Sequence, residues 1–279
     1  MRYAIDLAPL GELADPHAMV RLATAAERAG WDGVSTWDSL GVSIGAPASD
    51  PWVDLAAIAS ATERLALILS VVALPRHRPQ LVAQAAATLD RWSDGRFVLG
   101  VGAGGDPGDF ERFGEPFDAP ARVAAMDEGL DLVDRWLRDE TVDHAGPAFV
   151  ARGVGGLGPP PVQRPRPPIW IGGMKPGALR RAARWDGWIG IATSEDGSQL
   201  ELSPAAFAAL VARLAAERAA AGRANAPFEV ALFAFSEPSD RDLVAAYEAA
   251  GATWWLESLS PMRGSLDALL ARVEAGPPR

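Results

Sequence analysis

Two glycine-rich turns are the segments of this chain best suited to hold a planar or phosphate-bearing ligand. The first, Gly100 to Gly105, has few side chains, so its backbone can approach a flat ligand closely. The second, Gly172 to Gly177, leads into a helical pattern and contains Lys175, the only lysine of the chain. Backbone N–H groups at such a turn, beside a cation, predict a phosphate site. Both segments also have a structural interpretation, as close strand packing or as ordinary turns.

Few residues offer acid–base or metal chemistry. The only histidines are His17, His77 and His144, and cysteine is absent, which excludes disulfides, thiolate metal sites and a cysteine nucleophile. Asp38 and His77 follow predicted strands and are the candidates for acid–base work. Each has an alternative role, since Asp38 is suited to capping the next segment and His77 to solvation between two arginines.

The charge balance limits the classes of partner. The formal net charge is −10, and the bases are scattered along the chain. We therefore expect no binding to nucleic acid or to an anionic membrane surface. The first ten residues include Asp6 and lack a long apolar core, and no apolar run approaches about 18 residues, so neither a signal peptide nor a membrane span is predicted. The expected location is the cytoplasm and the expected partner a small-molecule substrate.

Short apolar runs alternate with longer amphipathic segments along the whole chain, which predicts repeated strand–helix units. Eight such pairs without a linker favour a closed (β/α)8 TIM barrel formed by residues 1–279 as one domain, with an open doubly wound sheet as the competitor. Asp–Pro and Ser–Pro pairs mark several helix starts. The predicted strands are Tyr3–Ala8, Gly33–Trp37, Leu65–Val72, Phe97–Gly102, Ile169–Gly172, Trp188–Ala192, Glu229–Phe235 and Thr253–Glu257, and the predicted helices are 15–30, 51–63, 79–92, 121–138, 176–185, 203–221, 239–250 and 264–275.

In a barrel of this kind the site lies in the loops that follow the strands, so residues at those positions are the candidates. Residues 6–11, 38–39 and 70–78 are among the positions selected in this way. Between residues 102 and 169 the alternation gives way to one helix and much irregular sequence. Long irregular segments in a compact domain are usually lids or functional loops, which is the expectation here.

Several long segments, in the right order, resemble the flavin-dependent oxidoreductases of the bacterial luciferase-like family. The resemblance extends over essentially the whole chain. It is carried by Ala26–Gly33 (AERAGWDG), Ala87–Gly104 (ATLDRWSDGRFVLGVGAG), Pro161–Gly173 (PVQRPRPPIWIGG), Ala183–Trp188 (ARWDGW) and Gly251–Trp255 (GATWW).

The resemblance implies a TIM barrel that binds FMN or the deazaflavin coenzyme F(420) at the carboxyl end of its strands. It places a bulge or a non-proline cis peptide, against which the ring rests, near Ser70 and Val71. It also implies that Gly102, Ala103 and Gly104 flank the ring. The phosphate site implied by the family consists of Gly172, Gly173 and Met174 with the hydroxyl groups of Thr193 and Ser194.

One departure from the family bears on catalysis. Many relatives have an Asp-His pair where this chain has Asp38 and Ser39, and a serine hydroxyl is too weak an acid to replace that histidine. Asp38 and His77 remain as candidates. The late insertion of many relatives is also missing, which either makes the site more open or leaves its shielding to residues 103–120 and 151–166. Relatives are often dimers, so a homodimer is the expectation.

Two reactions and two alternatives follow. Reduced FMN with oxygen implies a monooxygenase for a small organic substrate, whereas deazaflavin implies hydride transfer, and the sequence does not choose between them. The missing histidine supports an alternative, a flavin-binding or vestigial barrel without turnover. An aldolase or isomerase without flavin ranks last, because Lys175 follows a glycine turn and is better interpreted as a phosphate contact than as a Schiff-base lysine.

Overall fold

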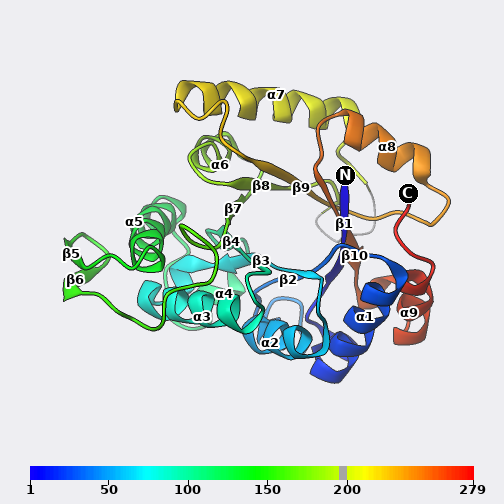
Figure 1. The fold of residues 1–279 in the computed structure, drawn as a ribbon, viewed down its shortest axis with the longest axis horizontal. Coiled ribbons are helices and arrows are strands. Elements are labelled where there is room, and N and C mark those ends of the chain that lie inside the picture. The colour runs from blue at the N-terminus through cyan, green and yellow to red at the C-terminus, as the bar shows by residue number, and fades with distance from the viewer. Residues whose placement is uncertain (195–199) are drawn as a thin grey trace.

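The fold is a closed barrel of parallel strands surrounded by helices, as the sequence predicts (Figure 1). The computed structural model describes residues 1–194 and 200–279. The strands follow one another around the barrel in the order β1, β2, β3, β4, β7, β8, β9, β10, and β10 pairs with β1 to close it. Their bounds are β1 Arg2–Leu7, β2 Gly33–Thr36, β3 Ala66–Ala73, β4 Phe97–Gly102, β7 Ile169–Gly172, β8 Gly187–Ile191, β9 Glu229–Ala234 and β10 Trp254–Leu259.

The helices begin where the sequence places capping residues before proline. Asp15 accepts a hydrogen bond from the backbone N–H of His17, and Asp50 accepts from Trp52 and Val53 in the same way. Their bounds are α1 Pro16–Ala29, α2 Pro51–Ala61, α3 Pro79–Trp92, α4 Gly108–Glu111, α5 Ala119–Leu137, α6 Pro176–Ala182, α7 Pro204–Ala220, α8 Arg241–Ala249 and α9 Leu266–Glu274, and the 3-10 turns are η1 Gly11–Ala14, η2 Leu74–Arg76 and η3 Pro261–Arg263.

The interior of the barrel is packed solidly at the end where the strands begin. Trp170 of β7 and Trp254 of β10 are buried there, with ring centroids 5.9 Å apart. The guanidinium of Arg2 lies 4.3 Å from the Trp254 ring, between the indole and the surface. This end is therefore closed, and any ligand that enters the barrel has to enter from the other end.

The stretch between β4 and β7 contains structure that the sequence analysis missed. It forms the antiparallel hairpin of β5 (Val142–Ala145) and β6 (Val150–Val154), which lies beside α5 (Figure 1). Leu132 of α5 packs with Val142 and Ala151 in a small separate cluster. Each strand is short and only partly apolar, which is why its pattern did not predict a strand.

Residues 151–166 do not shield the carboxyl ends of the strands, so that expectation was wrong. Leu157 accepts a hydrogen bond from the Gln84 side chain, and Pro160 accepts one from Arg91, both on α3. Backbone N–H groups of Val162 and Gln163 donate to Asp90 near the end of the same helix. The segment therefore runs along the outside of the helical layer toward the start of β7. Shielding by residues 103–120 stays a prediction.

Candidate functional site

The carboxyl ends of the eight barrel strands meet at one end of the barrel, called the mouth below. All residues proposed from the sequence to bind a coenzyme lie in or directly after these strand ends. The half-buried ones are Ser70, Val71, Ala103, Gly104, Gly172, Gly173, Met174, Thr193 and Ser194, and Gly102 is buried. These residues are partly accessible to solvent, whereas tryptophans close the opposite end of the barrel. A ligand can therefore reach the barrel interior at the mouth.

The centre of the mouth is formed by the end of β3. The peptide between Ser70 and Val71 is cis, at the position that the family resemblance implies. The pairing of β3 with β4 shifts register between Leu69 and Val72, so the strand bulges there. Val71 consequently packs toward the barrel interior although it does not continue the regular alternation of the strand.

Two glycines make room for the side chain of Val71. A Cβ atom on Gly102 of β4 would lie 2.6 Å from Val71 Cγ2, and one on Gly172 of β7 would lie 2.9 Å from Val71 Cγ1. Val71 and these two glycines thus pack closely and form one apolar surface, called the Val71 wall below. Such a surface fits the face of a planar ring. The glycines are needed for this internal contact, whether or not a ligand approaches them.

The loop after β4 continues this surface. Gly104 has φ +76°, and a Cβ there would lie 2.8 Å from the ring of Phe110. Ser43, after β2, donates a hydrogen bond to Asp106, and the backbone N–H of Leu40 donates to Asp109 at 3.2 Å. The loops after β2 and β4 are therefore joined on one side of the mouth.

The turn after β7 provides fewer amides for a phosphate than its sequence suggests. The N–H of Gly173 donates to the Ile189 carbonyl at 3.3 Å, and its carbonyl accepts from the Trp188 indole at 2.8 Å. Within the described residues, the N–H groups of Met174 and Lys175 donate no hydrogen bond. The Met174 sulfur accepts from the N–H of Ile191 at 3.2 Å, which brings this turn next to the end of β8.

Thr193 and Ser194 follow β8 and are therefore neighbours of that turn. β7 and β8 pair in parallel with Gly172 opposite Ile189, and Thr193 makes an isolated bridge with Leu200. Both hydroxyl-bearing residues are half-buried. The structure thus brings together, on one side of the mouth, the two segments that the family resemblance assigned to a phosphate.

Asp38 and His77, the acid–base candidates, are in contact. His77 Nε2 lies 2.7 Å from Asp38 Oδ2, which also accepts the backbone N–H of Ala73 at 3.0 Å. Arg76 forms ion pairs with Asp38 and, at 2.6 Å, with Asp109. Burial raises the pKa of Asp38, but the His77 hydrogen bond and the Arg76 charge outweigh burial, so its pKa is lowered.

The hydrogen bond to Asp38 determines which ring nitrogen of His77 carries the proton and which one can accept a proton. A carboxylate only accepts hydrogen bonds, so the proton of a neutral His77 ring belongs on Nε2, and Nδ1 remains as an acceptor. The His77 side chain is 31% exposed, whereas Asp38 is 8% exposed. Ser39 cannot replace a histidine, since its hydroxyl accepts a hydrogen bond from Gly41 within its own loop.

Asp6 at the end of β1 was among the strand-end positions selected from the sequence, but no role was predicted for it. It is 1% exposed, and its Oδ1 accepts hydrogen bonds from Ser35 of β2 and, at 3.0 Å, from Ser70 of β3. Its Oδ2 has no partner among the described residues. Burial, only partly offset by the two hydroxyl groups, raises the pKa of Asp6 to about 6. An acidic residue in an otherwise apolar strand was the available signal.

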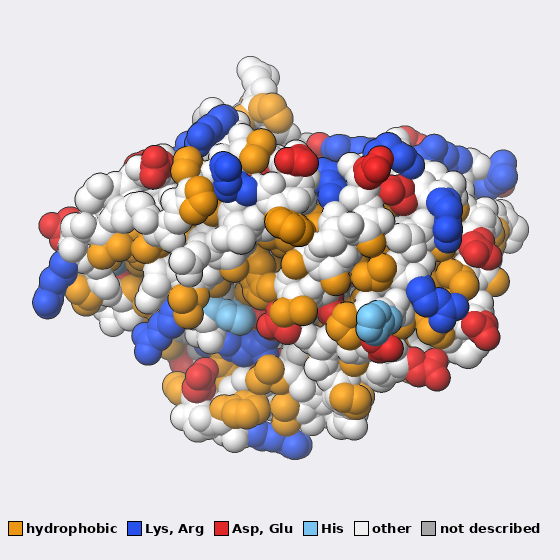
Figure 2. All heavy atoms as spheres, turned by 60° about the horizontal axis from the view of Figure 1, so that its bottom comes forward, with side chains coloured by type: hydrophobic (Ala, Val, Ile, Leu, Met, Phe, Trp, Pro, Cys, Tyr) orange, Lys and Arg blue, Asp and Glu red, His pale blue; other side chains and the backbone are white. Residues whose placement is uncertain are grey.

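Hydrophobic side chains are exposed around the mouth. Figure 2 shows one face of the molecule on which hydrophobic side chains gather around a hollow bordered by charged and histidine side chains. Exposed apolar surface of this kind often belongs to a binding site. The large apolar side chains exposed on the loops and strand ends of the mouth are Leu40, Ile44, Phe113, Ile191 and Met262.

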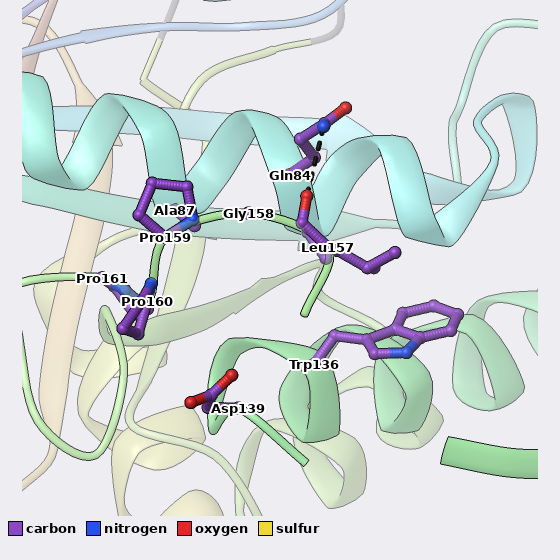
Figure 3. A pocket seen from close by; sticks show the side chains of 10 residues that line it. Gln84, Ala87, Trp136, Asp139, Leu157, Gly158, Pro159, Pro160 and Pro161 are labelled. Atoms are coloured by element: carbon purple, nitrogen blue, oxygen red, sulfur yellow. Dashed lines mark hydrogen bonds between the residues drawn. The ribbon is translucent and has the colours of Figure 1, made fainter. Parts of the chain in front are cut away.

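A pocket on the outer helical layer is not part of this site. It lies between α3, α5 and the proline-rich segment, and Gln84 crosses it to donate to the Leu157 carbonyl at 3.1 Å (Figure 3). Asp139 is the acidic residue that lines it, and histidine and lysine are absent from its lining. Its lining therefore offers no group suited to redox or acid–base catalysis.

Comparison with known proteins identifies the family of this chain. The sequence profile of the luciferase-like monooxygenase family matches residues 3–272. This chain belongs to the luciferase-like monooxygenase family. The family description names an enzyme class, the monooxygenases, and supports enzyme status for the chain.

Solved structures with the same fold include both oxygenases and deazaflavin enzymes. The monooxygenase RslO1 from Streptomyces bottropensis has a TM-score of 0.81 and 19% identity, with 99% of this chain and 97% of that chain covered. The coenzyme F(420)-dependent tetrahydromethanopterin reductase from Methanopyrus kandleri has a TM-score of 0.79 and 17% identity, with 99% and 98% covered. An F(420)-dependent secondary alcohol dehydrogenase has a TM-score of 0.79 and 17% identity, with 98% of both chains covered.

These neighbours establish the fold and leave the coenzyme open. At such identities the likeness concerns architecture, and function has to be argued from the site. In the described part of the chain, no helix is both long enough and apolar enough to cross a bilayer.

Proposed function

We propose that this protein is a flavin- or deazaflavin-dependent oxidoreductase acting on a small organic substrate, with residues 1–279 as one catalytic domain. The Val71 wall is the observation that carries the proposal. It offers an apolar surface at the accessible end of the barrel, in a chain whose family is that of luciferase-like monooxygenases. The bound coenzyme, FMN or coenzyme F(420), supplies the redox chemistry.

We assign the coenzyme phosphate to the turn after β7 and the end of β8. The N–H groups of Met174 and Lys175 have no acceptor among the described residues, and Gly172 and Gly173 hold the turn in place. The hydroxyl groups of Thr193 and Ser194 lie on the neighbouring strand end. Amides and hydroxyls are the donors that proteins commonly use for phosphate, and Lys175 adds a positive charge.

The chain's own residues then have three tasks. The Val71 wall, with Ala103 and Gly104 beside it, orients the ring. The exposed apolar rim, which includes Leu40 and Phe113, favours a substrate with little charge and excludes water when it closes on one. His77, held by Asp38, accepts or donates a proton at Nδ1.

The remaining features of the proposal follow from charge and family. A net charge of −10 favours a small-molecule partner over nucleic acid. A cytoplasmic location is part of the proposal, and a homodimer is proposed from the resemblance. A flavin-binding barrel without turnover is the second candidate, because Ser39 stands where many relatives have histidine and caps its own loop.

Titration of the purified protein with FMN, riboflavin and coenzyme F(420) tests the proposal. We expect one coenzyme type to bind, with a change of ring fluorescence, and Thr193→Ala to weaken FMN binding about tenfold without affecting riboflavin, which lacks the phosphate. Thr88→Ala, on the outer surface of α3, is the matched control. Failure of all three to bind would refute the proposed function, and binding without turnover of any substrate would favour the second candidate.

A further inference from the structure

Asp6 has an oxygen atom that the protein leaves without a hydrogen-bond partner. Oδ1 accepts from the hydroxyls of Ser35 and Ser70, whereas Oδ2 is buried and has no partner among the described residues. Leaving a buried polar atom unpaired costs about 1–3 kcal/mol, and most buried polar side-chain atoms in proteins are paired. The neighbouring side chains therefore do not explain why an acid stands at this position.

The side chain of Asp6 points into the barrel beside the Val71 wall. Ala4, two residues earlier on β1, packs in the barrel interior, and side chains two residues apart lie on the same face of a strand. Asp6 pairs in register with Ser35 on β2 and Ser258 on β10. Its contact Ser70 is half-buried and directly precedes Val71. Asp6 is thus one side chain away from the surface that we assign to the ring.

The strands packed around Asp6 bring hydroxyl groups toward it and no charge. Ser35, Ser70 and Ser258 come from β2, β3 and β10. Glu257 is bound by Arg263 and Arg272, and Asp38 is paired with Arg76. No charged neighbour contributes to the pKa of Asp6, which burial raises to about 6 against the effect of two hydroxyls. Asp6 therefore stays protonated to a higher pH than an ordinary aspartate, and a fraction of it still carries a proton near neutral pH.

We propose that Asp6 is a hydrogen-bond donor in the barrel interior, and that protonated Oδ2 donates to an oxygen or nitrogen atom of the planar ring bound against the Val71 wall. This assignment rests on the proposed function. A neutral carboxyl group has one O–H donor, and because Ser35 and Ser70 donate to Oδ1, the proton belongs on Oδ2. A carboxylic acid that burial keeps neutral can serve an enzyme in this way.

The pH dependence of riboflavin binding tests the assignment, with 5-deazariboflavin as the probe if only the deazaflavin coenzyme binds. Riboflavin has no phosphate, so its own titration does not interfere. We expect affinity to be constant well below pH 6 and to fall about tenfold per pH unit well above it, because only protonated Asp6 donates. Asp6→Asn, which keeps a donor at all pH values, removes this dependence.

Asp54 provides the matched control. It is a buried carboxyl whose pKa burial also raises to about 6, and its Oδ1 is also unpartnered, but it lies on α2 outside the strands. We expect Asp54→Asn to leave the binding profile unchanged. Infrared difference spectra give a second readout, in which a protonated carboxyl band shifts on riboflavin binding in the unsubstituted protein and is missing in Asp6→Asn.

The outcomes separate this inference from the proposed function. Ring binding that is independent of pH, or equally dependent on pH in Asp6→Asn, would overturn the role of Asp6 and leave the proposed function standing. An infrared band of Asp6 that does not respond to the ring would do the same. If riboflavin, FMN and the deazaflavin coenzyme all fail to bind, both proposals are wrong.

Discussion

Two buried carboxylates on neighbouring strands have very different partners in this fold. Glu257 of β10 and Asp6 of β1 lie next to each other around the barrel, and each is at most 1% exposed. Glu257 accepts hydrogen bonds from Ser236, Trp255 and Arg263 and forms an ion pair with Arg272 at 3.3 Å. Asp6 receives two hydroxyl groups and no cation.

The difference follows from the face of the strand on which each carboxylate lies. Leu256 packs in the barrel interior, so Glu257 points outward, where the arginines of η3 and α9 reach it. Asp6 points inward, where the adjoining strands offer only serine. A buried carboxylate that two arginines pair serves the fold, whereas one left with an unpartnered oxygen in the barrel interior is a candidate for ligand contact.

The largest effect is expected from Glu257→Gln. The substitution removes the charge shared by the half-buried Arg263 and the buried Arg272, and leaves both arginines without their common partner. Breaking a buried charge network in this way typically costs about 3–5 kcal/mol. We expect the free energy of unfolding, measured by urea denaturation at pH 7, to fall by that order. A loss well under about 1 kcal/mol would mean that the serine and indole donors alone stabilise this end of the barrel.

Asp6→Asn should change stability in the opposite direction, with an effect that develops between about pH 4 and pH 6 and is complete above that range. The pKa of Asp6 is raised from 3.8 to about 6, so the folded protein binds more protons than the unfolded chain between these values, and the stability contributed by Asp6 declines as pH rises. Asparagine removes this penalty. We expect Asp6→Asn to raise the free energy of unfolding by about 3 kcal/mol at pH 8 and to change it little at pH 4. Urea denaturation at both pH values measures this, and destabilisation at pH 8 would contradict it.

Most of the fold was predictable because its signals are local. Strand periodicity, the capping residues before Pro16 and Pro51, and the alternation of strands and helices depend on neighbouring residues, and the predicted strands agree with the observed bounds to within two residues. The β5–β6 hairpin was missed because its short strands are stabilised by packing on α5, which no local pattern reveals.

The site was predictable in position and less so in detail. The strand ends that would hold a ligand follow from the barrel architecture, but the reason for Gly102 and Gly172 is Val71, from a third strand. The Gly173 N–H donates to the Ile189 carbonyl because of the register between β7 and β8, and local sequence does not reveal that register. Asp6 stands out because no described residue donates a hydrogen bond to its Oδ2. A sequence does not show which donors the fold brings near an atom.

Asp38 offers the third and smallest test of the contrast, because its cation Arg76 also pairs with a second carboxylate, Asp109. Arg76 keeps Asp109 at 2.6 Å when Asp38 loses its charge, so Asp38→Asn leaves no unpaired arginine. We expect a loss of about 1–2 kcal/mol in the free energy of unfolding at pH 7. The pKa of Asp38 is lowered in the folded state, so its contribution is present above the ordinary aspartate pKa and disappears as pH falls through the folded value.

The difference between Asp38→Asn and the unsubstituted protein should therefore shrink toward pH 3, whereas that of Asp6→Asn grows toward pH 8. Urea denaturation of both variants across this range compares the two slopes directly. A parallel pH response of the two variants would mean that charge pairing at the rim and its absence in the barrel interior do not set the protonation of these acids. The contrast between Asp6 and the paired carboxylates would then lose its physical basis. It requires burial without a cation to raise the pKa of Asp6, and the contacts with His77 and Arg76 to lower the pKa of Asp38.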